Sequence, residues 1–214
     1  MARAKQARRG VPLSSRARTA QRTQQLPFVP PEIWHEPRED GREYRILVQR
    51  PGSGFRHVVS PQEIRDRLAD LPDNFVKPLE VVQLSQMTRK KQSFPCYGMQ
   101  WGSALYLYPI EENLEEEYSA PPKPSQVNEV RMFGGRWVHQ SRNVWKLIWT
   151  EQAIKDFYLN NILIHELGHL LDDRNSRAVD RERYAEWFAL HHGYKPTQKS
   201  RLAGVRQQVR RRHG

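Results

Sequence analysis

The chain has 214 residues, a length that suits one domain with a core of ordinary size. Its one cysteine, Cys96, excludes an internal disulfide framework and an all-cysteine metal site. The sequence has no apolar run of about 18 residues and no apolar block near its start, so we expect no membrane span and no signal peptide. These features predict a soluble protein of the cytoplasm.

The formal net charge of +11 is concentrated at the two ends of the chain. Residues 1–25 hold seven Lys and Arg and no acid, and the same is true of residues 195–214, so the middle is slightly acidic. We interpret residues 1–31 as a disordered basic arm, residues 32–194 as the folded domain and residues 195–214 as a basic tail. Three roles are open for these ends. They solubilise the protein, they bind nucleic acid or an acidic partner, or the N-terminal arm directs the chain to an organelle.

The first part of the domain shows turn, strand and helix patterns. The turn sequence "RPGSG" separates two runs of β-prone residues, which predicts a β-hairpin over residues 43–60. Ser60 followed by Pro61 is typical of a helix start and predicts a helix to about Leu71.

Further strands and loops are predicted between residues 79 and 149. Apolar runs at residues 79–87 and 103–110 predict two strands. The basic segment 88–98 between them and the acidic, proline-rich segment 111–125 predict surface loops. Residues 143–149, "NVWKLIW", alternate two faces and predict another strand.

Two helices are predicted at the end of the domain. Thr150 is a typical N-cap, and the helical pattern continues from there to Leu171 or Asp172. The segment "RNSRAV" interrupts this pattern. "DRERYAEWFALHH" then predicts a second helix that ends at Gly193.

The first of these helices contains the sequence HELGH at residues 165–169. At about 100° per residue, His165 and His169 lie about 40° apart on one side of the helix, away from its apolar face. Two imidazoles one turn apart are typical ligands of Zn²⁺, and Glu166 lies beside such an ion, where it can act as a general base. The motif therefore predicts a zinc metallopeptidase, a hydrolase acting on a protein or peptide substrate.

A catalytic zinc ion needs a third protein ligand. Asn175 stands where a metzincin has its third histidine, which argues against that arrangement. Asp172 and Asp173 continue the same helix, and we expect them to be solvated at its end. The carboxylates that follow the motif are Asp172, Asp173, Asp180, Glu182 and Glu186.

Together, "HELGH" and "ERYAEWFALHHGY" resemble the gluzincin metallopeptidases, in particular the HtpX and CAAX-prenyl-protease family with its pattern E-x-x-A-D-x-F-A-x-x-x-G-Y. The resemblance implies that Glu182 is the third zinc ligand. It also implies that Glu186, in place of the family's aspartate, hydrogen-bonds a zinc-binding histidine. Because only twelve residues separate His169 from Glu182, Glu186 stays the alternative ligand.

The similarity extends to minimal gluzincins and ImmA/IrrE-type peptidases. It implies an α+β, zincin-like fold with a small, twisted, mostly antiparallel sheet, the HExxH helix and a following Glu-bearing helix. By this resemblance the strand at residues 143–149 is the one along which an extended substrate pairs.

Two alternative functions stay open. One is a DNA- or RNA-associated metalloprotease that its basic ends direct to nucleic acid. The other is a non-catalytic protein with a structural zinc site. No residue is assigned to stabilise an oxyanion; the candidates are His191, His192, Tyr194 and Tyr158.

Overall fold

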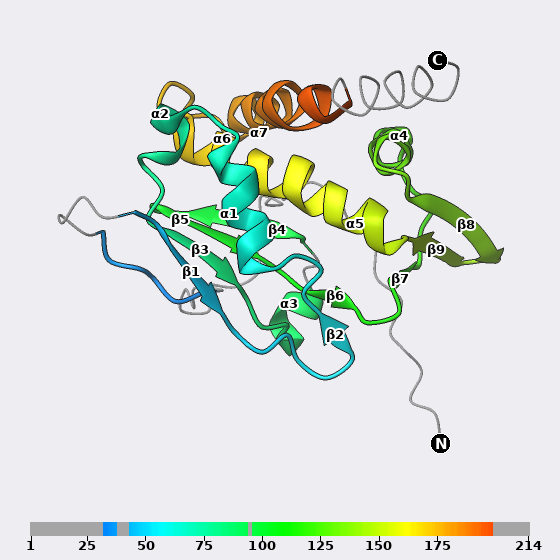
Figure 1. Cartoon of the computed structure of the whole chain (residues 1–214). Coiled ribbons are helices and arrows are strands. Elements are labelled where there is room, and N and C mark those ends of the chain that lie inside the picture. Colours follow the sequence, from blue (N-terminus) through cyan, green and yellow to red (C-terminus); the bar gives the residue numbers. More distant parts are fainter. Residues whose placement is uncertain (1–31, 38–42, 94–95, 199–214) are drawn as a thin grey trace, which may run out of the picture.

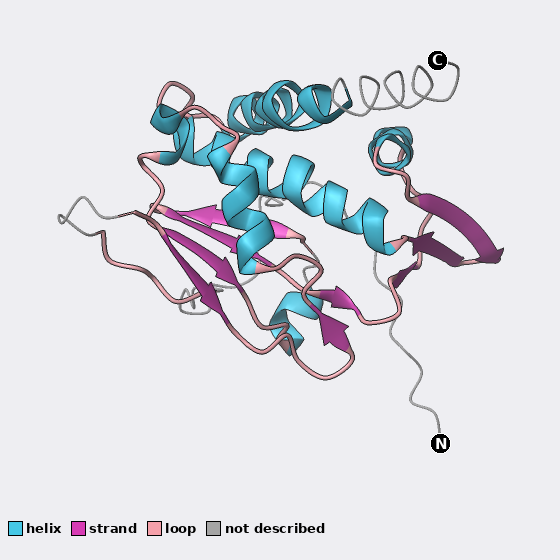
Figure 2. Ribbon diagram, viewed as in Figure 1, coloured by secondary structure: helices cyan, strands magenta, loops and turns pink. Residues whose placement is uncertain are grey.

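The computed structural model describes residues 32–37, 43–93 and 96–198, which form an α+β fold (Figures 1 and 2). The strands are β1 (Arg45–Val48), β2 (Phe55–Arg56), β3 (Val81–Leu84), β4 (Gly98–Trp101), β5 (Ala104–Leu107), β6 (Ile110–Glu111), β7 (Glu115–Tyr118), β8 (Arg136–Ser141) and β9 (Val144–Ile148). The helices are α1 (Pro61–Ala69), α2 (Asp73–Val76), α3 (Arg89–Ser93), α4 (Pro124–Met132), α5 (Glu151–Phe157), α6 (Leu163–Leu171) and α7 (Ala178–Phe188), with π-helical segments η1 (Tyr158–Ile162) and η2 (Ala189–Tyr194). The predicted α+β class is confirmed.

The largest sheet has four strands in the order β1-β3-β5-β4. β1 and β3 are parallel, β3 and β5 are parallel, and β4 lies antiparallel to β5 at one edge. Every residue of β3 and β5 is buried, as is usual for parallel strands covered on both faces. The prediction of a mostly antiparallel sheet is therefore wrong for these four strands.

The β-hairpin predicted over residues 43–60 does not form. β1 pairs with β3, and β2 pairs with β6. Gly52 and Gly54 do have positive φ angles, but their turn leads the chain away from β1 instead of back along it. By joining the parallel strands, β1 gains apolar neighbours on both faces, Ile46 on one side and Leu47 on the other.

A separate antiparallel sheet has the order β7-β9-β8. The strand predicted at residues 143–149 is confirmed as β9, but it lies in the middle of this sheet with β7 and β8 on its two sides. It is therefore not an edge strand on which a substrate could pair. The predicted loops are also wrong in part, because segment 88–98 contains α3 and segment 111–125 contains β7 and the start of α4.

A buried carboxylate explains why β7 does not read as a strand in the sequence. Glu116 is fully buried and accepts hydrogen bonds from the hydroxyl groups of Tyr97 at 2.6 Å and Tyr118 at 3.3 Å. Burial, and then the charge of Glu116, raise the pKa of Tyr97 well above its ordinary value, so Tyr97 keeps its proton as a donor. The middle glutamate of the run Glu115–Glu117 therefore faces inward, although all three residues look solvent-exposed in the sequence.

Thr150 caps a continuous helix, as predicted. Its hydroxyl oxygen accepts a hydrogen bond from the backbone N–H of Ala153 at 3.2 Å, and the helix continues through α5, η1 and α6 to Leu171. Ser60 caps α1 in the same way by accepting from the N–H of Glu63. Both predicted helix starts are confirmed.

The helix that begins with α7 does not end at Gly193. It continues through η2, and residues 195–198 are still helical. Gly193 instead allows close contact, because a side chain there would overlap the carbonyl oxygen of Asn160 in η1. Arg67 of α1 joins the same two π-helical segments, donating to Asn160 Oδ1 at 2.6 Å and to the His192 carbonyl oxygen.

The fold is layered (Figure 1). α1 and the long helix α5–η1–α6 lie on one face of the four-stranded sheet, and α7 packs on the far side of that long helix. On the opposite face of the sheet, residues 32–37 pack where His35 stacks on Tyr106. No helix within the described ranges is long and apolar enough to span a membrane. The predicted arm, residues 1–31, and residues 199–214 of the tail lie outside those ranges.

Candidate metal centre

Two histidines of α6 converge on one carboxylate of α7. Nε2 of His165 lies 3.7 Å from Oε2 of Glu182, and Nε2 of His169 lies 3.5 Å from Oε1. The three side chains are 3%, 10% and 21% exposed, respectively, so the cluster is largely shielded from water. One potential ligand atom from each residue lies within 4.8 Å of the others, and the three could hold a metal ion.

The position of the histidines follows from the local sequence of α6. His165 and His169 are one helical turn apart, and their ring centroids are 4.8 Å apart. Leu163, Ile164 and Leu167 are fully buried and belong to the main core. These apolar residues therefore pack in the core as predicted, but His165 and Glu166 are buried as well.

Small residues bring α7 close enough for Glu182 to reach the histidines. A side chain added at Gly168 would lie 3.0 Å from Cβ of Phe188 and 3.1 Å from Cα of Ala185. Ala185 is fully buried, and Glu182 lies three residues before it on the same side of α7. The glycine inside HELGH therefore has a packing role that sets the distance between the two ligand-bearing helices.

The donor set fits a zinc ion in chemistry and spacing. Structural and catalytic zinc sites use His nitrogen and carboxylate oxygen at about 2.0–2.2 Å, which places tetrahedral ligands about 3.3 Å apart. The nitrogen-to-oxygen separations, 3.7 Å to Oε2 and 3.5 Å to Oε1 of Glu182, are slightly larger than that value, and all the ligand atoms lie within 4.8 Å of one another. Small side-chain movements would therefore suffice to close the three residues around one ion.

Glu166 lies beside this cluster, underneath the outer strand β4. Its side chain is buried, and a Cβ added at Gly98 of β4 would lie 3.0 Å from both Cγ and Oε1 of Glu166. The same Cβ would lie 2.7 Å from Cγ2 of Ile162. Gly98 therefore lets β4 approach the carboxylate more closely than any other residue would.

The other predicted carboxylates lie elsewhere. Glu186 is exposed one turn after Glu182 and is not among the three residues that converge. Asp172 ends α6, is buried and accepts hydrogen bonds in the following loop, so the prediction that it is solvated is wrong. Asp173 is exposed, as predicted, and Asp180 forms ion pairs with Arg177 and Arg183. Between the two alternatives that the sequence leaves open, the geometry favours Glu182 as the third ligand.

The four oxyanion candidates each make structural contacts. The Tyr158 hydroxyl donates to the carbonyl oxygen of Tyr108 at 2.6 Å, and Tyr194 packs on Phe133. The His192 ring packs against Phe75 and Phe188, and burial lowers its pKa, with His191 and Arg67 adding to that effect. Nδ1 of His191 lies 2.9 Å from the Trp187 carbonyl oxygen.

Sequence reasoning missed three features of this centre. β4 is the outer strand nearest α6, although the sequence pointed to residues 143–149. Gly98 was also missed, because it was predicted at the end of a loop and not in a strand, where a glycine often marks the close approach of another group. The third missed feature is Arg181, whose contacts are described below.

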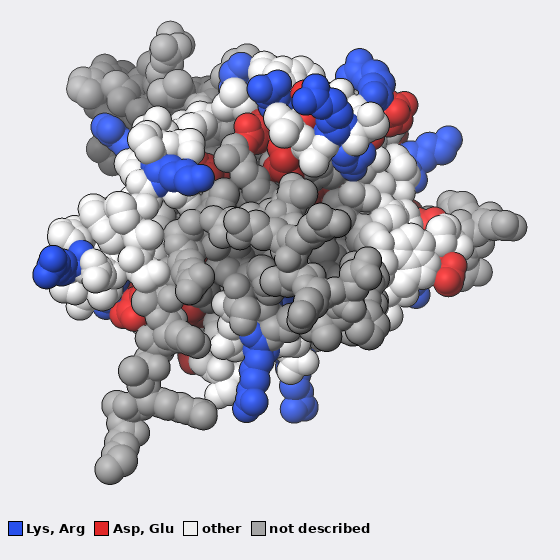
Figure 3. Space-filling view, turned by 180° about the vertical axis from the view of Figure 1, so that it is seen from behind, with Lys and Arg blue, Asp and Glu red and all other residues white. Residues whose placement is uncertain are grey.

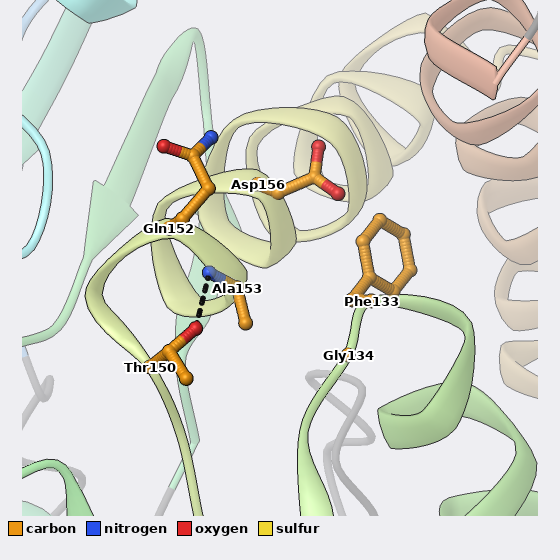
Figure 4. A pocket seen from close by; sticks show the side chains of 6 residues that line it. All are labelled: Phe133, Gly134, Thr150, Gln152, Ala153 and Asp156. Carbon is orange, nitrogen blue, oxygen red and sulfur yellow. Dashed lines mark hydrogen bonds between the residues drawn. The ribbon is translucent and has the colours of Figure 1, made fainter. Parts of the chain in front are cut away.

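A surface hollow of about 270 Å³ lies away from these residues (Figure 4). It lies between the end of α4 and the first turns of α5, where the Thr150 cap is visible. Its lining residues are Phe133, Gly134, Thr150, Gln152, Ala153 and Asp156. None of them belongs to the histidine cluster, so the hollow is not part of the candidate metal centre.

Comparison with known proteins assigns no family to this chain, so a function has to be argued from the residues of the site. No protein-family model matches the chain, and no curated protein and no solved structure matches it.

Proposed function

We propose that this chain is a zinc-dependent metallopeptidase of the gluzincin type that hydrolyses peptide bonds. The observation that carries the proposal is the convergence of His165, His169 and Glu182, with Glu166 next to them under an edge strand. The HExxH helix, the following Glu-bearing helix and a small sheet with an antiparallel edge strand also support a zincin-like fold.

The proposed chemistry divides between the metal and Glu166. When bound, zinc would polarise the substrate carbonyl group and lower the pKa of a coordinated water to about 7. Glu166 would accept the proton from the attacking water and deliver it to the leaving amine nitrogen. His165, His169 and Glu182 would hold the ion, and their burial keeps competing water away from it.

β4 is the strand on which we propose that an extended substrate binds. Tyr108 N–H donates to the Tyr97 carbonyl oxygen, so alternate residues of β4 bond inward to β5. By this alternation the backbone groups of Gly98 and Gln100 point to the outer edge, where a peptide strand could pair with them. Because a Cβ added at Gly98 would lie 3.0 Å from Glu166, a peptide on this edge would pass beside the general base.

The decisive test is Glu166→Gln compared with wild type. The variant should keep about one zinc per chain by metal analysis, because Glu166 is not among the converging ligands. It should lose cleavage of an unstructured protein such as casein by about a hundredfold or more, because the general base is gone. Glu151→Gln serves as a matched control, since Glu151 is an exposed residue on the same long helix.

The alternatives predict different results. A structural zinc site predicts bound zinc with no cleavage by wild type. A purified chain without zinc, whose thermal unfolding does not respond to a chelator, would overturn every metal-based interpretation.

A further inference from the structure

The connection between α6 and α7 must turn sharply for Glu182 to reach His169. α6 ends at Leu171 and α7 begins at Ala178. Asp172 closes the loop from one side, since its Oδ1 accepts hydrogen bonds from the backbone N–H and from Nδ2 of Asn175, at 3.2 Å and 2.9 Å. This Asx-type contact fixes the first half of the loop but does not reach α7.

Arg181 makes the link from α7 back to α6. Its Nη2 donates to the carbonyl oxygen of His169 at 3.0 Å, and its Nη1 donates to the carbonyl oxygen of Asp172 at 3.1 Å. The last carbonyl groups of a helix have no partner within the helix, and a cation at that end is favourable. The planar guanidinium group thus binds two such carbonyl groups with two fixed donors.

The Arg181 contacts connect the two helices right beside the proposed metal ligands. The carbonyl group that Arg181 binds belongs to His169 itself, and the next residue after Arg181 is Glu182. On a helix, adjacent side chains point about 100° apart, so the Arg181 side chain can hold the end of α6 while Glu182 faces the imidazoles. The contact fixes where the first turn of α7 lies along α6.

The other arginines near this loop lie differently. Lys and Arg side chains gather on the upper part of the molecule, where α7 lies, with Asp and Glu among them (Figure 3). The side chains of Arg177 and Arg183 are 82% and 74% exposed and contact Asp180. Arg181 is half-buried and binds backbone, so its role differs from that of its neighbours.

We propose that Arg181 is a positioning residue of the metal centre, which sets the distance from Glu182 to His169. This proposal rests on the proposed zinc site and deepens it, because it identifies what holds the third ligand in place. Loss of the guanidinium group would let the start of α7 move, so that Glu182 would spend less time within ligand distance of the histidines.

The first experiment measures zinc affinity by competition with a chromophoric chelator. Arg181→Met should weaken zinc binding about 10- to 100-fold, the usual effect of removing a group that orients a ligand. Arg181→Lys should restore part of the affinity, because one ammonium group can reach a carbonyl oxygen but cannot bind two as a fork. Arg183→Met, the matched control on the other side of Glu182, should change affinity by less than about twofold.

The second experiment separates positioning from general stability. In a Glu182→Gln background, Arg181→Met should have almost no further effect on zinc affinity, because the ligand that it positions is already lost. Additive losses, or wild-type affinity in Arg181→Met, would overturn the proposal while leaving the zinc site intact. A loss of metal-free folding in Arg181→Met, seen by circular dichroism, would also overturn it. A wild-type chain that binds no zinc would overturn the zinc site, and this proposal with it.

Discussion

The close approach of β4 to Glu166 makes Gly98→Ala the most informative substitution for the geometry of the centre. An added Cβ would lie 2.7 Å from Ile162 and 3.0 Å from two atoms of Glu166. Overpacking of this kind costs about 1–3 kcal/mol, whereas replacing glycine returns about 0.4–1 kcal/mol through the unfolded state. We expect the free energy of unfolding to fall by about 1–2 kcal/mol.

Urea denaturation measures this change directly, as a lower midpoint with an unchanged m-value. In a Glu166→Ala background Gly98→Ala should cost less, because two of the three nearest atoms are then absent. Cleavage should fall by about tenfold or more at unchanged zinc content, because the methyl group displaces the Glu166 carboxylate. An equal cost in both backgrounds, or a gain in stability, would refute the close approach.

Two further predictions concern the parts of the fold around the centre. Arg67→Met should lower the free energy of unfolding by about 2–4 kcal/mol, because it removes charged hydrogen bonds to Asn160 and to the His192 carbonyl group. Urea denaturation measures this loss, and Arg65→Met, at an exposed position on the same helix, should cost far less. Burial lowers the pKa of His57, and its hydrogen bond to the Gln49 carbonyl oxygen opposes this shift in part. The folded protein therefore favours the neutral imidazole, so the contribution of His57 to stability is complete above pH about 6.5 and declines as the pH falls toward the lowered pKa. Urea midpoints at a series of pH values should therefore fall on the acid side, and His57→Gln should flatten that fall; a steeper fall in the variant would contradict this reasoning.

The parts of the centre that lie within one helix could be predicted from the sequence. The spacing of His165 and His169 is fixed by helix geometry, and the Thr150 cap depends on contacts three residues away. The prediction of Glu182 as a ligand depended on the resemblance to gluzincins, because the approach of Glu182 to the histidines depends on how two helices pack at Gly168 and Ala185. Local patterns carry no information about that packing.

The sheet could not be predicted for the same reason. The pairing of β1 with β3 joins residues that are far apart in the sequence, and the turn signal at Gly52 and Gly54 suggested the nearer partner. Glu116 made its strand look like a surface loop, because a carboxylate usually faces water unless donors such as Tyr97 surround it. Each error comes from a long-range contact that outweighs a local preference.

The π-helical segment η1 makes the centre depend on the backbone as well as on the ligand side chains. It stands between the capped start of the long helix and HELGH, so its wider turn sets the rotation of the histidines relative to α5. If the same residues formed an ordinary α-helix, His165 and His169 would be turned by about 100° around the axis, because the wider turn absorbs one residue. A chain with every side chain of the centre intact would then present its imidazoles to a different neighbour, whereas deleting one residue from η1 would restore an α-helix and keep their direction.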